Sequence, residues 1–259
     1  MAKIAVTGAT GRVGRHVVDI AEERGHEVVQ ISRSTGVDVI SGEGLAEALA
    51  GVDTIIDTAT GPSPDEQAAT EFFTTAMRNV QTAGAEAGVQ LLVLVSIVGC
   101  DRFSGGYNKA KIVQEQLALD GPIPARILRA TQFHEFVEEL MSWTIHDGVA
   151  HLPRMRTQLV AARTVAEALV DLATDSEYDA TSIPEIAGPR EEDLVEAASL
   201  VAARRGEGLR VEHASDPSNP DVVLWEAGAS LPSPGATLAG PTFEEWLEAT
   251  VPAGQGSRA

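Results

Sequence analysis

Near its start the chain reads Val6-Thr7-Gly8-Ala9-Thr10-Gly11-Arg12-Val13-Gly14, with a glycine at every third position. Residues 3–7 are typical of a short buried strand, and apolar residues recur at helical spacing from Val13 to Ala21. Glycines at this junction permit a sharp turn, let the backbone approach a pyrophosphate and let the helix pack closely on the sheet. The helix N-terminus then presents free N–H groups to the phosphates. The stretch therefore predicts a dinucleotide-binding turn, the alternative being a glycine-rich turn without a ligand.

Strand and helix signals alternate from this stretch to Thr131. Apolar runs bounded by turn residues predict strands, and helical spacing predicts the helices between them. The order βαβαβαβαβ indicates an α/β fold, a Rossmann-type doubly wound parallel sheet whose ligands lie at the carboxyl ends of the strands. The expected strands are 3–7, 27–32, 54–58, 90–96 and 125–129, and the longer expected helices are 65–87 and 107–119.

The regular alternation loosens after Thr131. We expect residues 1–131 to form the dinucleotide-binding core and residues 132–259 to form a smaller, substrate-facing lobe, with a segment near 157–188 returning to the core. The expected helices of this second part are 133–146, 164–174, 191–204 and 242–250, and the expected strands are 185–187 and 209–213.

The net charge of the chain limits the kinds of molecule that it is expected to bind. The chain has 259 residues and a formal net charge of −19, whereas nucleic acid and anionic membranes both require a positive surface. We therefore expect a small-molecule substrate, no nucleic acid, no membrane, and a monomer or homodimer. Cys100 is the single cysteine, which excludes an intrachain disulfide and, without a signal-peptide pattern at Met1, favours the cytoplasm. The six histidines lack metal-ligand spacing, so no metal is expected.

The end of the second expected strand indicates which dinucleotide binds. An NAD site commonly has an acidic residue there, but this chain has Ser32-Arg33-Ser34. Arg33 can bind a 2′-phosphate by a charge-assisted bond, with Arg12 beside it, so NADP(H) is preferred and NAD(H) is possible. The alternative is that Arg33 is a solvated surface residue. The other residues expected to bind the cofactor are Gly8, Thr10, Gly11, Val13, Gly14, Asp38 (toward the adenine), Thr58, Ala59 and Lys111.

Three residues around the fourth expected strand are candidates for catalysis. The strand ends at Ser96, Tyr107 follows eleven residues later, and Lys111 lies four residues beyond it on the same helix face. A neighbouring ammonium favours the phenolate and lowers the pKa of a tyrosine from ~10, which suits Tyr107 to proton transfer. Ser96 could bind a carbonyl oxygen. The alternative is a chance Tyr–Lys spacing on a solvated helix face.

The quoted motifs resemble the short-chain dehydrogenase/reductase superfamily, and within it the atypical NmrA-like group of NAD(P)H-binding proteins. The resemblance extends over nearly the whole chain. It is carried by the glycine turn, Leu94-Val95-Ser96-Ile97-Val98-Gly99, the pair Tyr107 and Lys111, Ile127-Leu128-Arg129-Ala130-Thr131-Gln132-Phe133, and Leu238-Ala239-Gly240-Pro241-Thr242-Phe243-Glu244-Glu245-Trp246-Leu247.

The resemblance implies a Rossmann domain, a smaller C-terminal lobe over the nicotinamide, and a preference for NADP(H). Ser96, Tyr107 and Lys111 match the catalytic triad of the superfamily, and Asn79 takes the place of the asparagine in its proton relay. The group includes reductases as well as members that bind the dinucleotide without turning it over, and fold analogy alone does not choose between them.

Residues after the fifth expected strand are candidates for the substrate pocket. Phe133, His134 and Phe136 would lie just past the carboxyl end of that strand, with His134 as a possible second acid or base; packing within the lobe is the alternative. The leading hypothesis is an NADPH-dependent oxidoreductase that reduces a small carbonyl, enone or quinone by hydride transfer. The alternative is a non-catalytic, NADP(H)-sensing regulator of the NmrA type.

Overall fold

The computed structural model describes residues 1–178, 182–206, 208–215 and 219–252. Within it the chain divides into two compact units. Unit 1 comprises Met1–Asp101, Gly105–Arg129 and Arg163–Pro184, and unit 2 comprises Arg102–Ser104, Ala130–Ala162 and Glu185–Ala259. The chain therefore contributes residues 102–104 to unit 2 and then returns to unit 1 for residues 105–129. It returns to unit 1 once more for residues 163–184.

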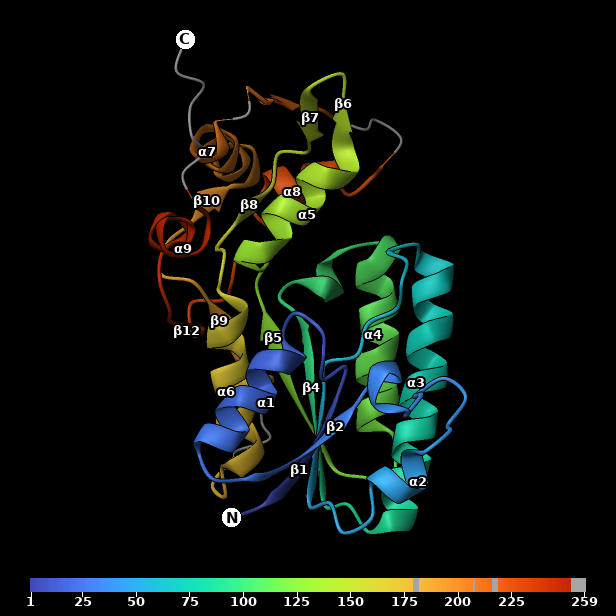
Figure 1. Ribbon diagram of the computed structural model, residues 1–259. Helices are drawn as coiled ribbons and strands as arrows, with labels where there is room; N and C mark the ends of the chain where they lie inside the picture. The colour runs from blue at the N-terminus through green and yellow to red at the C-terminus, as the bar shows by residue number, and fades with distance from the viewer. Residues whose placement is uncertain (179–181, 207, 216–218, 253–259) are drawn as a thin grey trace. The chain divides into compact units, whose positions relative to one another are not determined.

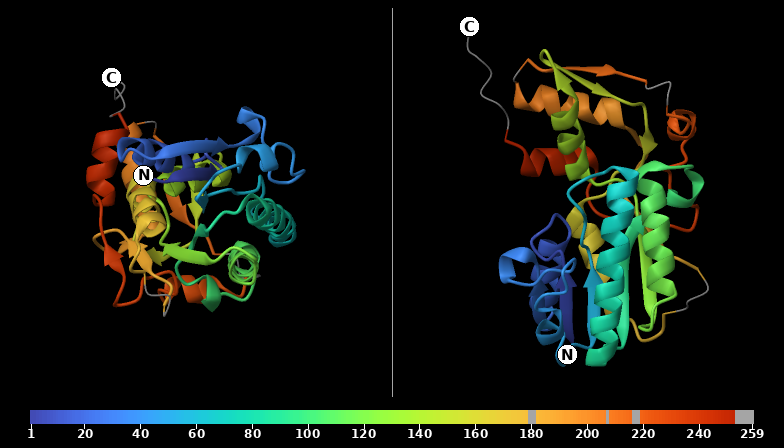
Figure 2. Two further views of the ribbon diagram at one scale, coloured as in Figure 1. Left: turned by 90° about the horizontal axis from the view of Figure 1, so that it is seen from below. Right: turned by 90° about the vertical axis from the view of Figure 1, so that its right-hand side faces the viewer.

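Unit 1 is a parallel sheet with helices on both faces, and its strand order is β5-β4-β3-β1-β2. Helices α1 and α6 cover one face, and α3 and α4 lie side by side on the other (Figures 1 and 2). The expected doubly wound parallel sheet is confirmed. The strands are β1 (Lys3–Thr7), β2 (Glu27–Ile31), β3 (Thr54–Asp57), β4 (Leu91–Ile97) and β5 (Ala125–Ala130), and the helices are α1 (Gly14–Glu23), α2 (Leu45–Ala48), α3 (Glu66–Ala87), α4 (Gly106–Leu119) and α6 (Ala162–Thr174), with 3-10 turns η1 (Arg33–Thr35) and η2 (Cys100–Arg102).

The register of the sheet brings the strand ends into one row. Thr7 pairs with Ile31 on one side and with Asp57 on the other, and Asp57 pairs in turn with Leu94. Every residue of β3 is buried, as expected for a central parallel strand that helices cover on both faces. Side chains that follow these ends are therefore gathered at a single edge, where ligands bind in sheets of this type.

Helix α3 shows how local sequence sets the limits of an element. The Asp65 carboxylate accepts a hydrogen bond from the Ala68 N–H at the start, and Gly88 ends the helix in a left-handed conformation with φ of 81°. Its buried face includes Met77 and Val80, which pack with residues of the sheet, and Phe73, which packs with Ala110 and Tyr107 of α4. The helix thereby forms one wall of the larger apolar core of unit 1.

Unit 2 has its own apolar core, built from α5, β7, α7 and α9. The sequence predicted a helix to residue 146, but α5 ends at Thr144 and the chain turns back as a hairpin. Asp147 and Gly148 form the turn with φ of 48° and 75°, the backbone that an Asp-Gly pair favours. The elements are α5 (His134–Thr144), β6 (Ile145–His146), β7 (Val149–Leu152), β8 (Arg156–Thr157), β9 (Glu185–Ala187), β10 (Glu192–Asp193), α7 (Leu194–Arg205), β11 (Arg210–His213), α8 (Val222–Glu226), β12 (Thr237–Leu238) and α9 (Phe243–Thr250).

A substitution at Gly14, the first residue of α1, tests how closely this helix packs against the glycine turn. A methyl group on Gly14 would lie 2.1 Å from the Gly8 carbonyl oxygen, so we expect Gly14→Ala to lower the free energy of unfolding by ~1–3 kcal/mol. Gly235→Ala is the control, because its added methyl group meets no atom within 4 Å. Denaturant titration of both variants measures the difference. Equal stability of the two would contradict this account of the turn.

Candidate functional site

The glycine turn leaves β1 as the sequence predicted. Gly8 has a φ of 66°, and a side chain there would lie 2.8 Å from the Thr58 carbonyl oxygen. The Gly11 N–H donates to the Gly8 carbonyl at 2.8 Å, which closes the turn. Gly8 and Gly14 are thus required by contacts within the protein itself.

Gly11 differs from the other two glycines in its surroundings. It is exposed, and the only atom within 4 Å of a methyl group placed on it would be the Gly8 carbonyl oxygen, at 3.0 Å. Thr10 beside it is exposed and Arg12 half-buried, whereas Val13 is buried. The crest of the turn is therefore open, and the N–H groups at the start of α1 add a positive field there. These residues fit the pyrophosphate of a dinucleotide.

The loop after β2 carries the residues expected to select the cofactor. Arg33 is exposed on η1, whose shape is fixed by the Thr35 hydroxyl, which donates to the Ser32 carbonyl oxygen at 2.8 Å. The Asp38 carboxylate accepts the Ile40 N–H at 2.8 Å and so shapes the next turn. Asn79 on α3 donates to the carbonyl oxygens of Val39 and Ile40, which directs its amide to this loop.

Tyr107 is placed at the carboxyl edge of the sheet by two contacts. Its hydroxyl hydrogen-bonds the Thr60 hydroxyl at 2.9 Å, and Thr60 lies three residues past the end of β3. Its ring packs edge-on against Phe73 of α3, with the ring centroids 5.7 Å apart. The phenol is half-buried, so it is both fixed and accessible. Thr58 and Ala59, expected to line the cofactor, lie in the same short segment.

Lys111 lies in the interior of unit 1. Its Nζ donates to the Val95 carbonyl oxygen at 2.8 Å and to Gln114 Oε1 at 2.5 Å, and it lies 4.9 Å from the centroid of the Phe73 ring. Burial lowers the pKa of Lys111 to about 8, and the nearby carboxylates of Asp57 and Glu115 oppose that shift. The amine is therefore tied to β4 and to its own helix.

Asp57 is a site residue that sequence reasoning missed. Its buried carboxylate accepts hydrogen bonds from the Thr7 hydroxyl, from the Ala59 N–H at 3.1 Å and from Gln114 Nε2 at 3.1 Å. Gln114 in turn accepts from Lys111. A continuous chain of hydrogen bonds thus joins the end of β1, the segment after β3 and Lys111. The sequence feature that could have indicated Asp57 is its position as an acidic residue at the end of the apolar strand β3.

Ser96 is deeply buried beside a second group of polar residues. Its Oγ lies 3.9 Å from Cys100 Sγ, and that thiol donates to Glu115 Oε1 at 3.5 Å. Glu115 binds Arg129 through two hydrogen bonds, of 2.9 and 2.7 Å, and Arg129 also reaches Asp101 at 3.0 Å. Burial raises the pKa of the Cys100 thiol to about 11, so it is protonated at neutral pH.

The residues expected to line the substrate pocket lie in unit 2. His134 is fully buried, its Nε2 lies 3.2 Å from the Pro241 carbonyl oxygen, and its ring packs against Phe243 and Trp246. Burial lowers the pKa of His134 to about 4, so the ring is neutral at physiological pH. Phe133 precedes α5, and the Phe136 ring contacts Trp143 edge-on with the centroids 6.2 Å apart.

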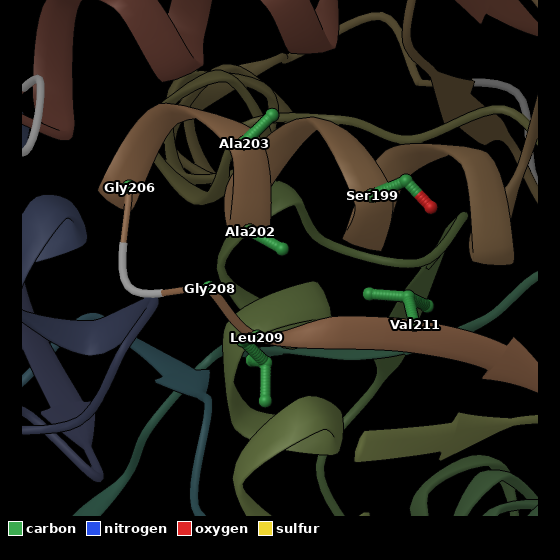
Figure 3. A pocket seen from close by; sticks show the side chains of 7 residues that line it. All are labelled: Ser199, Ala202, Ala203, Gly206, Gly208, Leu209 and Val211. Carbon is green, nitrogen blue, oxygen red and sulfur yellow. The ribbon is translucent and has the colours of Figure 1, made fainter. Parts of the chain in front are cut away.

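Unit 2 also contains two open cavities. One of about 390 Å³ lies between α7 and β11, and Figure 3 shows that small and aliphatic side chains line it. The other, of about 410 Å³, has charged walls that include Arg154, Arg156 and Glu226. Neither is lined by Ser96, Tyr107 or Lys111.

The described ranges also bear on metal binding and on membrane insertion. Within them no group of three or more His, Cys, Asp or Glu side chains could hold a metal ion. None of the helices described there has the length and apolar character needed to cross a membrane.

The buried Lys111 predicts how stability depends on pH. Its folded pKa of about 8 lies below the ordinary 10.5, so between these values the unfolded chain binds more protons and stability rises with pH. We expect Lys111→Met to remove an increase on the order of 1–3 kcal/mol in unfolding free energy between about pH 7 and about pH 10.

Lys109 supplies the matched control, because it is exposed on the same helix as Lys111 and pairs with Glu66 of α3 at 3.2 Å. Denaturant titrations at several pH values should show that Lys109→Met keeps the wild-type pH dependence. A wild-type profile in Lys111→Met would mean that the amine is not titrating in this interval.

Comparison with known proteins gives a match to one family model. Residues 8–133 match the model of a family described as NAD(P)H-binding. A curated relative, the 3-beta-hydroxysteroid dehydrogenase of Mycolicibacterium neoaurum, is 31% identical over 157 residues. That match covers 46% of this chain and 43% of the relative, so it spans less than half the length of each.

Solved structures share the fold at low identity. MoeE5 in complex with UDP-glucose and NAD has a TM-score of 0.71 and 18% identity, covering 96% of this chain and 99% of that chain. The dTDP-4-dehydrorhamnose reductase of Bacillus anthracis in complex with NADP has a TM-score of 0.70 and 16% identity, covering 96% and 98%. Residues 8–133 of this chain therefore match the NAD(P)H-binding family model, and the chain shares its fold with these NAD- and NADP-bound structures.

Proposed function

We propose that the protein is an NADPH-dependent oxidoreductase that reduces a small carbonyl, enone or quinone. The observation that carries the proposal is the hydrogen bond of 2.9 Å between Tyr107 and Thr60, because it holds a phenol at the strand edge onto which the glycine turn also opens. The name of the mycobacterial relative, a hydroxysteroid dehydrogenase, supports a carbonyl or alcohol substrate.

In this proposal each side chain has a separate task. The reduced nicotinamide, when bound, supplies a hydride. Tyr107 donates its hydroxyl proton to the substrate oxygen, and the exposed Thr60 hydroxyl passes a proton from water back to Tyr107. Ser96 orients the substrate oxygen. Lys111 supports the site through Gln114 and Asp57 and, as expected from the sequence, contributes to cofactor binding.

The preference for NADP(H) rests on the cations at the adenosine side. Arg33 is exposed on a turn whose backbone is held by hydrogen bonds, and its planar guanidinium can bind a phosphate through two parallel hydrogen bonds. Arg12 lies in the glycine turn, next to the exposed Gly11. Asp38 is assigned to the adenine, and the segment Thr58–Ala59 to the adjoining cofactor contacts.

One observation favours the alternative of a dinucleotide sensor without turnover. The Lys111 amine is engaged by Val95 and Gln114, whereas a catalytic lysine is expected to act on the tyrosine and the cofactor ribose. A protein that binds NADPH and reduces none of a broad panel of ketones, enones and quinones would be such a sensor.

The role of Tyr107 has a direct test. We expect Tyr107→Phe to lower kcat for ketone reduction by ~10²–10⁴-fold and to leave the Kd for NADPH nearly unchanged, because only the proton-carrying hydroxyl is lost. Tyr178, the other tyrosine, lies against Arg126 and supplies the control. Steady-state kinetics should show wild-type rates for Tyr178→Phe. Full ketone reduction by Tyr107→Phe would rule out the proposed proton donor.

Cofactor selection is tested at Arg33. A charge-assisted contact to a phosphate is worth ~1.5–3 kcal/mol, so Arg33→Ala should weaken NADPH binding roughly ten- to a hundredfold and NADH binding little. Arg24→Ala removes a surface arginine that pairs with Asp171 at 2.7 Å and should change neither affinity. Fluorescence titration with both dinucleotides measures the ratio, and equal losses at Arg33 would contradict recognition of the 2′-phosphate.

A further inference from the structure

Helix α4, which carries Tyr107, begins without a side-chain cap of its own. Its N-cap residue is Gly105, which has no side chain to accept the N–H groups that the first turn of a helix leaves without intrahelical partners. Gly106, the first residue of the helix, has a φ of 68°, a conformation that side chains disfavour. Two successive glycines therefore leave the start of α4 in need of an acceptor from another element.

That acceptor is the carboxylate of Glu66, the first residue of α3. Its Oε2 accepts the Gly106 N–H at 2.7 Å, the length of a charge-assisted hydrogen bond, and its Oε1 lies 3.2 Å from Lys109 Nζ. The hydrogen bond from Gly106, and after it the one from Lys109, holds the pKa of Glu66 below its usual range, so the carboxylate is ionised at neutral pH. Its negative charge also suits the positive end of the α4 dipole.

The carboxylate is closely fitted to the start of α4. A methyl group on Gly105 would lie 3.1 Å from Glu66 Oε2. The backbone of Glu66 is held as well, because its carbonyl oxygen accepts the Thr70 hydroxyl at 2.6 Å and because Asp65 caps α3 through the Ala68 N–H at 3.0 Å. Glu66 therefore extends from a helix whose own first turn is fixed by hydrogen bonds.

Tyr107 follows Gly106 directly, so a displacement of the Gly106 peptide moves the tyrosine with it. The other contacts of Tyr107 come from the same stretch of chain that contains Glu66. The phenol hydroxyl lies 2.9 Å from the Thr60 hydroxyl, and the ring packs edge-on against Phe73 with the centroids 5.7 Å apart. Residues 60–73 thus hold the backbone, the ring and the hydroxyl of this tyrosine, and all of these residues belong to unit 1.

We propose that Glu66 is a positioning residue for Tyr107, which it fixes through the hydrogen bond from the Gly106 N–H. The inference rests on the proposed function, because Tyr107 is the proton donor in that proposal. It adds the residue that sets the backbone from which the phenol extends. Because the task of Glu66 is geometric, a neutral side chain that still accepts the N–H should perform most of it.

The test uses the full chain and variants that separate the hydrogen bond from the ion pair. Glu66→Ala removes both, Glu66→Gln keeps an oxygen acceptor for the Gly106 N–H without the charge, and Lys109→Met removes only the ion pair. Glu71→Ala is the matched control, since Glu71 is another carboxylate of α3 and its hydrogen bond, from Gln67 at 3.0 Å, lies within that helix. Circular dichroism and thermal denaturation establish that each variant is folded.

The first readout reports the hydrogen bond itself and needs no turnover. Exchange of the Gly106 amide hydrogen with solvent, followed by NMR, should become about tenfold faster in Glu66→Ala because the N–H loses its acceptor. The rate should stay within about threefold of the wild type in Glu66→Gln and in Lys109→Met. It should be unchanged in Glu71→Ala.

The second readout is the steady-state reduction of isatin by NADPH. Glu66→Ala should lower kcat roughly tenfold, because a small misplacement of a reacting group is costly, while the KM for isatin and the Kd for NADPH change by less than about twofold. Glu66→Gln should restore kcat to within about threefold of the wild type, and Lys109→Met and Glu71→Ala should keep the wild-type value. A general loss of stability would produce neither the rescue nor the separate effect on kcat.

Several outcomes would overturn the positioning role. Unchanged Gly106 exchange in Glu66→Ala would do so, as would faster exchange with an unchanged kcat, because Tyr107 would then work without the anchor. A loss of kcat in Glu66→Gln or in Lys109→Met as large as that in Glu66→Ala would assign the effect to charge and would also overturn it.

Failure of the proposed function gives a different result. In that case the wild type reduces none of a panel of ketones, enones and quinones that includes isatin, and exchange alone decides the inference. Faster Gly106 exchange in Glu66→Ala, with near-wild-type exchange in the other variants, then still supports the anchoring of Tyr107 by Glu66. Unchanged exchange overturns it.

Discussion

The buried carboxylate of Asp57 is the interaction on which the candidate site depends. It receives the Thr7 hydroxyl from the end of β1, the Ala59 N–H from the segment after β3, and the Gln114 amide from α4. Those three partners belong to the glycine turn, to the expected cofactor contacts and to the helix that carries Tyr107. A carboxylate removed from water is stable only when its oxygens are satisfied, so losing one partner would leave an uncompensated charge. The three donors that satisfy the Asp57 carboxylate therefore also fix the positions of the end of β1, the segment after β3 and α4 relative to one another.

A second buried charge completes this arrangement. Lys111 is fully enclosed, and its nearest acceptors are the uncharged oxygens of Val95 and Gln114. Asp57 and Glu115 act on it from a greater distance and favour its charged form, while burial opposes that form and lowers its pKa to about 8. Glu115 is held by Arg129, which leaves Asp57 and Lys111 joined through the Gln114 amide. Gln114 suits this place because its amide donates to the carboxylate and accepts from the ammonium at once.

The sequence predicted the parts of the site that depend on local spacing. Gly8 and Gly14 were recognisable because β1, the turn and α1 are contiguous, and the order of strands followed from periodicity. The Asp57–Gln114–Lys111 chain was not predictable in that way, since Asp57 and Gln114 lie 57 residues apart and meet only after the sheet has formed. In unit 2 the expected helix of residues 133–146 ends two residues early, at Thr144, because Ile145 and His146 pair with β7 across the Asp147-Gly148 turn. Propensity alone cannot rank two local signals when tertiary packing decides between them.

A strongly acidic chain can still contain the proposed NADP(H) site, because charge–charge interactions act only over a short distance in salt solution. At physiological ionic strength charges are screened beyond about 8 Å, so most of the net charge of −19 is not felt at the glycine turn. What a phosphate meets there is the N-terminus of α1, with no acidic residue in its first turn, and the nearby guanidinium of Arg12. Two buried acids of unit 1 are already engaged within the protein, Asp57 by its three donors and Glu115 by Arg129. Local satisfaction of carboxylates by hydrogen bonds, more than overall charge, therefore decides which anions this surface accepts.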